Sequence, residues 1–252
     1  MNTSVFEQYE SEVRSYCRSF PAVFTKAKGS VIYAEDGKQY IDFFCGAGAL
    51  NYGHNNDYIK KRVIDYLESD GIIHSLDMFT SAKRDFIDFF EKNVLIPRGL
   101  NYKIQFPGPT GTNAVEAALK LARKVKKRNN VFAFMGAFHG MTLGSLALTT
   151  DRASREGAGV ELENVTHIPA PYMFPELDVI KYMQTLLDDD HSGVKKPACR
   201  GHYRTCSVGR RNIRFLKRIF TGPSRVLHQK RHTSYLRRYS GRLCKNGNVL
   251  LV

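Results

Sequence analysis

A glycine-rich turn that precedes a helical pattern is the first feature of this chain that could bind a small molecule. The turn runs from Pro107 to Asn113 and carries hydroxyl groups at Thr110 and Thr112. The N–H groups and positive dipole end of a helix N-terminus favour an anion such as phosphate. The turn is neither a P-loop nor a dinucleotide fingerprint, because it lacks their glycine, lysine and hydroxyl spacing. The alternative interpretation is an ordinary connection between a strand and a helix.

A second turn, Gly136–Gly140, follows the next apolar segment. Phe138 could stack on a flat ring, and His139 follows it directly. The alternative is a packed core aromatic beside a loop histidine. Turns that follow parallel strands open at the carboxyl edge of a sheet, where ligands of α/β proteins bind. We therefore expect both turns at one edge of the same sheet.

The elements that would position these turns alternate between strands and helices. Apolar runs predict strands at 31–33, 40–44, 102–106 and 130–134, with the first two paired around Glu35–Lys38. Helical spacing predicts helices at 4–18, from Asn56 to Gly71, from Ser81 to Pro97, at 113–128 and around 177–187. In the helix after Asn56 the apolar residues fall on one face: Ile59, Val63, Tyr66 and Leu67. In the helix after Ser81 the expected inward positions are Phe86, Phe89, Phe90 and Val94. This alternation predicts an α/β fold with a mostly parallel sheet.

Two longer segments carry a family resemblance. The segment from Phe106 to Arg123 and the segment from Asp42 to Asn55 together resemble the class III, fold-type I aminotransferases that use pyridoxal 5'-phosphate. The first is similar to one branch, the diaminobutyrate–2-oxoglutarate aminotransferases of ectoine synthesis. The resemblance covers residues 4–198. It implies an incomplete fold-type I transferase, with 1–58 in the small domain and 59–198 beginning the large cofactor-binding domain.

The resemblance also implies the site and the activity. Gly111 and Thr112 would bind the cofactor phosphate with Thr110 adjacent, Phe138 would stack on the pyridine ring, and His139 would lie beside it. The substrate side would be lined by Gly48, Ala49 and Asn51. The reaction would move an amino group from glutamate to aspartate 4-semialdehyde, giving 2,4-diaminobutyrate and 2-oxoglutarate. The alternative within the family is another ω-aminotransferase, acting on ornithine or 4-aminobutyrate.

The resemblance also implies a homodimer. Residues 1–198 contain only two isolated cysteines, Cys17 and Cys45, which suits a reducing cytoplasm. The N-terminus lacks the basic and apolar regions of a signal peptide, and no run of 18 apolar residues occurs, so we expect no membrane association.

All of the net charge lies in residues 199–252. This segment holds 14 of the 38 lysines and arginines and none of the 24 acidic residues, so 1–198 is balanced. Such a segment attracts phosphates, and its aromatic residues could stack on bases. A basic nucleic-acid-binding protein is therefore the alternative from another class, and non-specific nucleic-acid binding is expected either way. The cysteines and histidines of 199–252 lack zinc-ligand spacing, which predicts no metal site.

Against the family pattern, residues 199–252 resemble a gene read out of frame. One back-translation of 232–243, shifted by one base, encodes an apolar strand ending in two aspartates, similar to the family's cofactor-aspartate strand. The chain contains no acidic residue after Asp190. The aspartate that holds the pyridine nitrogen is therefore absent. Lys217, Lys230 and Lys245 lack the family's motif around the Schiff-base lysine, so we expect no catalytic residue and no turnover. We also expect 199–252 to be disordered and to supply no strand.

Overall fold

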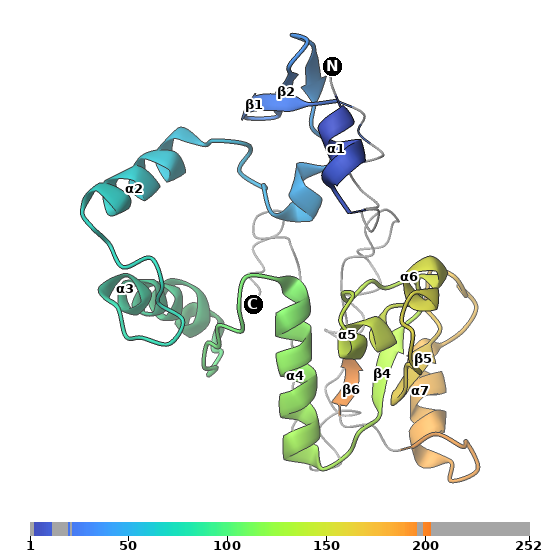
Figure 1. Cartoon of the computed structure of the whole chain (residues 1–252). Helices are drawn as coiled ribbons and strands as arrows, with labels where there is room; N and C mark the ends of the chain where they lie inside the picture. The colour runs from blue at the N-terminus through green and yellow to red at the C-terminus, as the bar shows by residue number, and fades with distance from the viewer. Residues whose placement is uncertain (1–2, 12–19, 21, 196–198, 203–252) are drawn as a thin grey trace. The chain divides into compact units, whose positions relative to one another are not determined.

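The computed structural model describes residues 3–11, 20, 22–195 and 199–202 (Figure 1). It divides into two compact units, with the boundary between Ser75 and Leu76. Each unit is described by itself.

The first unit contains a three-stranded antiparallel sheet. Its strands β1 (Phe24–Lys28), β2 (Val31–Ala34) and β3 (Gln39–Ile41) lie in the order β1-β2-β3. The predicted pairing around Glu35–Lys38 is confirmed, with Val31 opposite Ile41. The strand ends at Ile41 instead of Phe44, because the Asp42 carboxylate accepts hydrogen bonds from the N–H groups of Phe44 and Cys45 and turns the chain.

The helices of the first unit come before and after these strands in the chain. They are α1 (Ser4–Tyr9), the 3-10 turn η2 (Cys45–Gly48) and α2 (Asp57–Glu68). The part of the predicted opening helix beyond Ser11 lies outside the described residues. The predicted cap of α2 is confirmed, since Asn56 Oδ1 accepts from Ile59 N at 3.3 Å. The apolar residues Ile59, Val63 and Leu67, which recur every four positions along α2, are all exposed.

The second unit begins with a continuous helical stretch. It comprises α3 (Ser81–Phe90), η3 (Glu91–Leu95) and η4 (Ile96–Arg98), and it ends at Gly99, which has a φ of +62°. Thr80 caps α3 through Lys83 N. Phe86 and Phe89, which we expected to face inward, are exposed, whereas Leu95 is fully buried. Helical spacing thus predicted the helix but not its partner surface.

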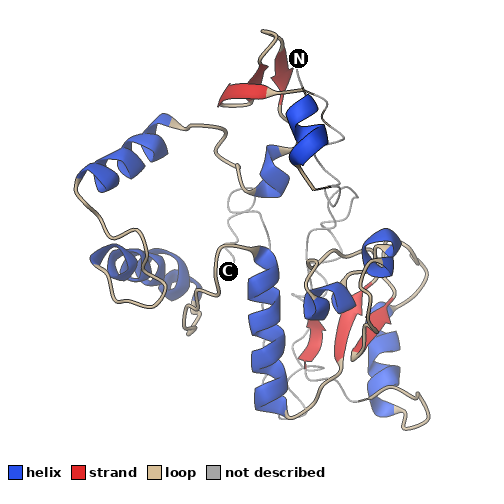
Figure 2. Cartoon of the chain, viewed as in Figure 1, coloured by secondary structure: helices blue, strands red, loops and turns tan. Residues whose placement is uncertain are grey.

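A parallel sheet with helices on both faces forms the rest of the second unit (Figure 2). Its strands β4 (Val131–Phe134), β5 (Val165–Ile168) and β6 (Cys199–His202) lie in the order β5-β4-β6, and both pairs are parallel. The helices are α4 (Gly111–Lys126), α5 (Leu143–Leu148), α6 (Arg152–Glu156) and α7 (Val179–Asp188). The predicted α/β fold with a parallel sheet is confirmed for the described residues.

Strand β4 separates two hydrophobic clusters. Val131 and Ala133 pack with Val115 and Leu119 of α4 on one face. Phe132 points to the other face, where it packs with α7 through Val179 and Met183. Successive strand residues face opposite sides, so a strand covered on both faces is apolar throughout. This packing fixes the position of α4, and with it the position of the glycine-rich turn.

Two predictions about strands are wrong. Residues 102–106 form no strand, because a strand needs a hydrogen-bonded neighbour and no described strand pairs with this segment. Conversely, Cys199–His202 form β6 beside β4, although we expected no strand after Ala198. A parallel ladder uses backbone groups, which any extended segment can supply. The predicted disorder of 203–252 and the absence of a zinc site there lie outside the described residues.

Candidate anion-binding site at the start of α4

The glycine-rich turn leads directly into α4. Thr110 is the N-cap residue, and its Oγ1 accepts from Thr112 N at 3.4 Å. Gly108 has a φ of +104°, a backbone conformation that residues with a side chain rarely adopt, so glycine is favoured in this turn. Thr110 and Gly111 are exposed. The first turn of α4 thus presents its positive dipole end beside the exposed Thr110 and the half-buried Thr112, an arrangement suited to a phosphate.

The second turn follows β4 and is held by two buried or half-buried threonines. Gly136 N donates to Thr150 Oγ1 at 2.8 Å, and His139 N donates to Thr149 Oγ1 at 2.9 Å. Phe138 is 36% exposed, whereas His139 is only 2% exposed. Phe138 therefore has a surface available for a ligand ring. His139 is largely enclosed by the protein.

The structure brings the two turns together. Thr112 Oγ1 lies 2.9 Å from Thr142 Oγ1 and 2.5 Å from Ser145 Oγ, both just after the second turn. Gly140, with a φ of +133°, approaches Thr112 so closely that a Cβ would overlap its hydroxyl. The two turns therefore lie together beside the carboxyl end of β4, as expected, although the first turn does not follow a strand.

A carboxylate that sequence reasoning missed lies behind Thr112. Glu116 Oε1 accepts from Thr142 Oγ1 at 2.5 Å and from Ser145 N at 2.9 Å. Glu116 is one helical turn after Thr112 on α4, so this spacing of four residues was the available signal. Its partners are 26 and 29 positions away in the sequence, and no local pattern identifies them.

Gly48, Ala49 and Asn51 belong to the first unit and are described apart from the α4 site. They follow a tight turn in which Ala47 has a φ of +53°. The ends of this loop are joined by His54 Nε2 and Asp42 Oδ2, 2.7 Å apart. The N–H of Cys45 and the His54 side chain hold the pKa of Asp42 below its usual value. The loop is therefore tied to the sheet at both ends.

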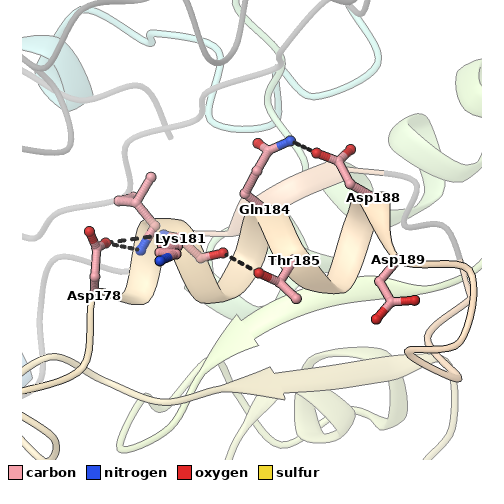
Figure 3. Close-up of a pocket in the computed structure, with 7 residues that line it drawn as sticks. Asp178, Lys181, Gln184, Thr185, Asp188 and Asp189 are labelled. Atoms are coloured by element: carbon pink, nitrogen blue, oxygen red, sulfur yellow. Dashed lines mark hydrogen bonds between the residues drawn. The ribbon is translucent and has the colours of Figure 1, made fainter.

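A hollow along α7 lacks a glycine-rich turn such as the one that favours a phosphate at the start of α4 (Figure 3). Its side chains bond mainly within the helix: Asp178 caps Ile180 N and Lys181 N, and Thr185 donates to the Lys181 carbonyl at 3.0 Å. The lining residues are Asp178, Ile180, Lys181, Gln184, Thr185, Asp188 and Asp189. Three acidic residues there disfavour a phosphate. Among the described residues, no group of histidine, cysteine and acidic side chains is arranged to hold a metal ion.

Residues 14–192 match the family model described as aminotransferase class III. The chain belongs to the class III aminotransferases. The resemblance inferred from Asp42–Asn55 and Phe106–Arg123 is therefore confirmed.

Named class III aminotransferases include close relatives of this chain. It is 57% identical over 196 residues to a diaminobutyrate–2-oxoglutarate transaminase of Halalkalibacterium halodurans, covering 77% of this chain and 46% of that protein. It is 56% identical over 197 residues to a protein of the same name from Nocardia farcinica, covering 78% and 45%. The chain thus spans about half the length of the curated relatives it matches.

Solved aminotransferase structures share the fold. An S-selective transaminase from Arthrobacter sp., with alanine bound, aligns with a TM-score of 0.59 at 20% identity, covering 73% of this chain and 44% of that one. The omega transaminase from Pseudomonas jessenii, in complex with PMP, aligns with a TM-score of 0.59 at 15% identity, covering 74% and 46%. The predicted fold-type I architecture is confirmed for the part of the chain that aligns. No described helix is long and apolar enough to cross a membrane.

Proposed function

We propose that these residues belong to an aminotransferase that moves an amino group from glutamate to aspartate 4-semialdehyde, giving 2,4-diaminobutyrate and 2-oxoglutarate. The observation that carries this proposal is the 57% and 56% identity to two diaminobutyrate–2-oxoglutarate transaminases over nearly the whole balanced part of the chain.

Pyridoxal 5'-phosphate is the proposed cofactor, and the described residues fit its phosphate end. Gly111 and Thr112 would bind the phosphate at the start of α4, with Thr110 adjacent. This is supported by the exposure of Thr110 and Gly111, and by a hydroxyl at Thr112 that already makes hydrogen bonds of 2.5 and 2.9 Å. When bound, the cofactor supplies an electron sink for the bond that breaks at the substrate amine carbon.

The ring end would be held by the second turn. Phe138 would stack on the pyridine ring, supported by its partial exposure beside the end of β4. His139 would lie beside the ring as a largely buried side chain. The family resemblance places the Schiff-base lysine and the ring aspartate after Ala198, and residues 199–252 contain no acidic residue. We therefore assign the described residues to binding and orientation, not to proton transfer.

Domain organisation and assembly are part of the same proposal. Residues 1–58 would contribute to a small domain, with Gly48, Ala49 and Asn51 on the substrate side, and 59–198 would begin the large domain. The protein would be a homodimer. The exposed apolar side chains of α2 support this assembly, because such a surface is normally covered by a partner.

Two measurements test the proposed function. The first measurement uses a longer protein, in which the sequence after Ala198 is read in the restored frame and continues into the second half of the family domain. This protein should transfer an amino group from glutamate to aspartate 4-semialdehyde, and it should do so more efficiently than it transaminates ornithine or 4-aminobutyrate. The polypeptide 1–252 alone should bind pyridoxal 5'-phosphate without turnover. A preference for ornithine or 4-aminobutyrate would reject the substrate assignment. Turnover by 1–252 would reject the assignment of its residues to binding alone.

A further inference from the structure

Four side chains form a connected group behind the first turn of α4. Thr112 and Glu116 come from α4, Thr142 precedes α5, and Ser145 lies in its first turn. The three hydroxyl oxygens lie within 2.5–2.9 Å of one another, and Thr142 and the Ser145 N–H both bond to Glu116 Oε1. Ser145 is fully buried. This group joins the proposed phosphate residue Thr112 to Thr142 and Ser145, which follow the turn that carries Phe138.

Glu116 determines how the hydrogens of this group are shared. An ionised carboxylate only accepts, and each hydroxyl carries one hydrogen. Thr142 therefore donates its hydrogen to Glu116 and can only accept from the other two hydroxyls. Ser145 can donate to Thr112 across 2.5 Å or to the Thr142 carbonyl at 3.0 Å. The Thr112 hydrogen points to Thr142 at 2.9 Å, and a bound phosphate oxygen, which also only accepts, would take the place of Thr142 as its acceptor.

Glu116 also caps the start of α5. The third N–H of a helix has no acceptor within the helix, and the N-cap side chain usually accepts it. Here the N-cap Thr142 makes no such bond, and Glu116 of α4 accepts the Ser145 N–H instead. One carboxylate oxygen of α4 thus bonds to the start of α5 and fixes the position of one helix against the other.

We propose that Glu116 is a positioning residue for cofactor phosphate binding, acting through Thr112. It orients Thr142 and Ser145, and these fix the Thr112 hydroxyl so that it donates to the phosphate. This inference rests on the proposed function, because it assigns the phosphate to the start of α4. Without Glu116, the Thr142 hydrogen and the Ser145 N–H both lose their acceptor, and the group around Thr112 rearranges.

The test compares the affinities of variants of the 252-residue chain for pyridoxal 5'-phosphate and for pyridoxal, which lacks the phosphate. Glu116→Ala should weaken binding of the phosphate form about tenfold and leave pyridoxal within twofold, since only the phosphate contact changes. Glu116→Gln keeps an acceptor oxygen and should retain affinity within about threefold, since neutral hydrogen bonds are weaker but present. The matched control is Glu163→Gln, an exposed carboxylate outside the group.

A second variant displaces the carboxylate without removing it. A Cβ at Gly144 would overlap the Glu116 carboxylate, and Gly144 lies in helix α5, where alanine is favourable. Gly144→Ala should therefore keep the fold, measured by its thermal midpoint, and weaken pyridoxal 5'-phosphate binding severalfold.

A double-variant cycle shows whether Glu116 acts through Thr112. Thr112→Val combined with Glu116→Ala should bind pyridoxal 5'-phosphate no more weakly than Thr112→Val alone. If the two substitutions weaken pyridoxal 5'-phosphate binding additively, or if Glu116→Ala weakens pyridoxal binding by the same factor, the positioning role of Glu116 is wrong. The proposed function would not be affected by that result. If Thr112→Val itself binds like the unchanged chain, or the unchanged chain does not bind, then the phosphate assignment of the proposed function fails, and the inference fails with it.

Discussion

At the residue scale, the candidate site depends on close contacts between the second turn and the residues that surround it. Gly140 reaches Thr112 at a φ of +133°, and the N–H groups of Gly136 and His139 are each accepted by a threonine hydroxyl. These contacts hold Phe138 at the end of β4 with part of its ring exposed. The cofactor's phosphate and its ring are therefore expected to contact different residues. Single substitutions can then weaken one contact without the other.

The first prediction concerns the ring. Phe138→Ala should weaken binding of pyridoxal 5'-phosphate and of pyridoxal by the same factor, about threefold to tenfold, because stacking is worth about 0.5–1.5 kcal/mol and does not involve the phosphate. Fluorescence titration of both ligands measures this. Phe174→Ala, at another exposed phenylalanine of the same unit, is the control. A loss limited to the phosphate form would remove Phe138 from the ring site.

The second prediction concerns Gly140. Gly140→Ala adds a methyl group against the Thr112 hydroxyl and should destabilise the protein by about 1–3 kcal/mol through overpacking. Strain at positive φ adds to this, about 1–2 kcal/mol. Gly159→Ala is a control without overlap, because Gly159 also has a positive φ, +68°, and open space around it. Urea unfolding measures both variants. Equal losses would show that Thr112 moves aside without cost.

At the element scale, short segments are fixed by side chains that bond to neighbouring backbone. Asp42 ends β3 and accepts from Phe44 N and Cys45 N at 2.8 Å, and His54 bonds to its other oxygen. Glu116 performs a similar task between α4 and α5. The Asp42 carboxylate fixes a local loop, whereas Glu116 joins segments that are 26 and 29 positions apart. The loop that carries Gly48, Ala49 and Asn51 therefore depends on the ionisation of Asp42.

The third prediction follows from the lowered pKa of Asp42, which is caused first by the Cys45 N–H and then by His54. A carboxyl with a folded pKa below its unfolded value of about 3.9 stabilises the fold above that unfolded value. This contribution is lost as the pH falls through the folded pKa. The thermal midpoint of the unchanged protein should therefore fall more steeply below pH 4 than that of Asp42→Asn. Parallel curves for the two proteins would contradict the assignment.

At the scale of the whole molecule, much apolar surface stays uncovered. Helix α2 has no buried residue, and Ile59, Val63 and Leu67 are exposed along it. Exposed apolar surface of this extent usually marks an interaction site. In the proposed homodimer this side of α2 would be covered by a second copy of the chain.

The fourth prediction tests this assembly. The protein should self-associate in sedimentation velocity experiments at micromolar concentration, and Val63→Asp should shift it toward the monomer by placing a charge on the apolar side of α2. Lys61→Asp introduces the same group about 200° around the helix and should leave the distribution unchanged. If Val63→Asp and Lys61→Asp sediment alike, α2 is not part of the interface.

The sequence by itself determined the family, the helix α4 with its glycine-rich turn, and the alternation that predicts a parallel sheet. These are local properties. The spacing of Val115 and Leu119 specifies a helix, and the run from Val131 to Phe134 specifies a strand covered on both faces. Thr110, Gly111 and Thr112 stand where the turn becomes a helix, so their position follows from their neighbours in the chain.

Only the tertiary structure decided which residues meet. Thr112 contacts Thr142 and Ser145, 30 and 33 positions away, and Glu116 joins the same group, because α4 packs beside α5 over the face of β4. The tertiary structure also decided which apolar residues are buried. Leu119 is buried against the sheet, whereas Val63, with equally regular spacing, is exposed. Periodicity specifies a side of a helix, but burial depends on whether another element lies against that side.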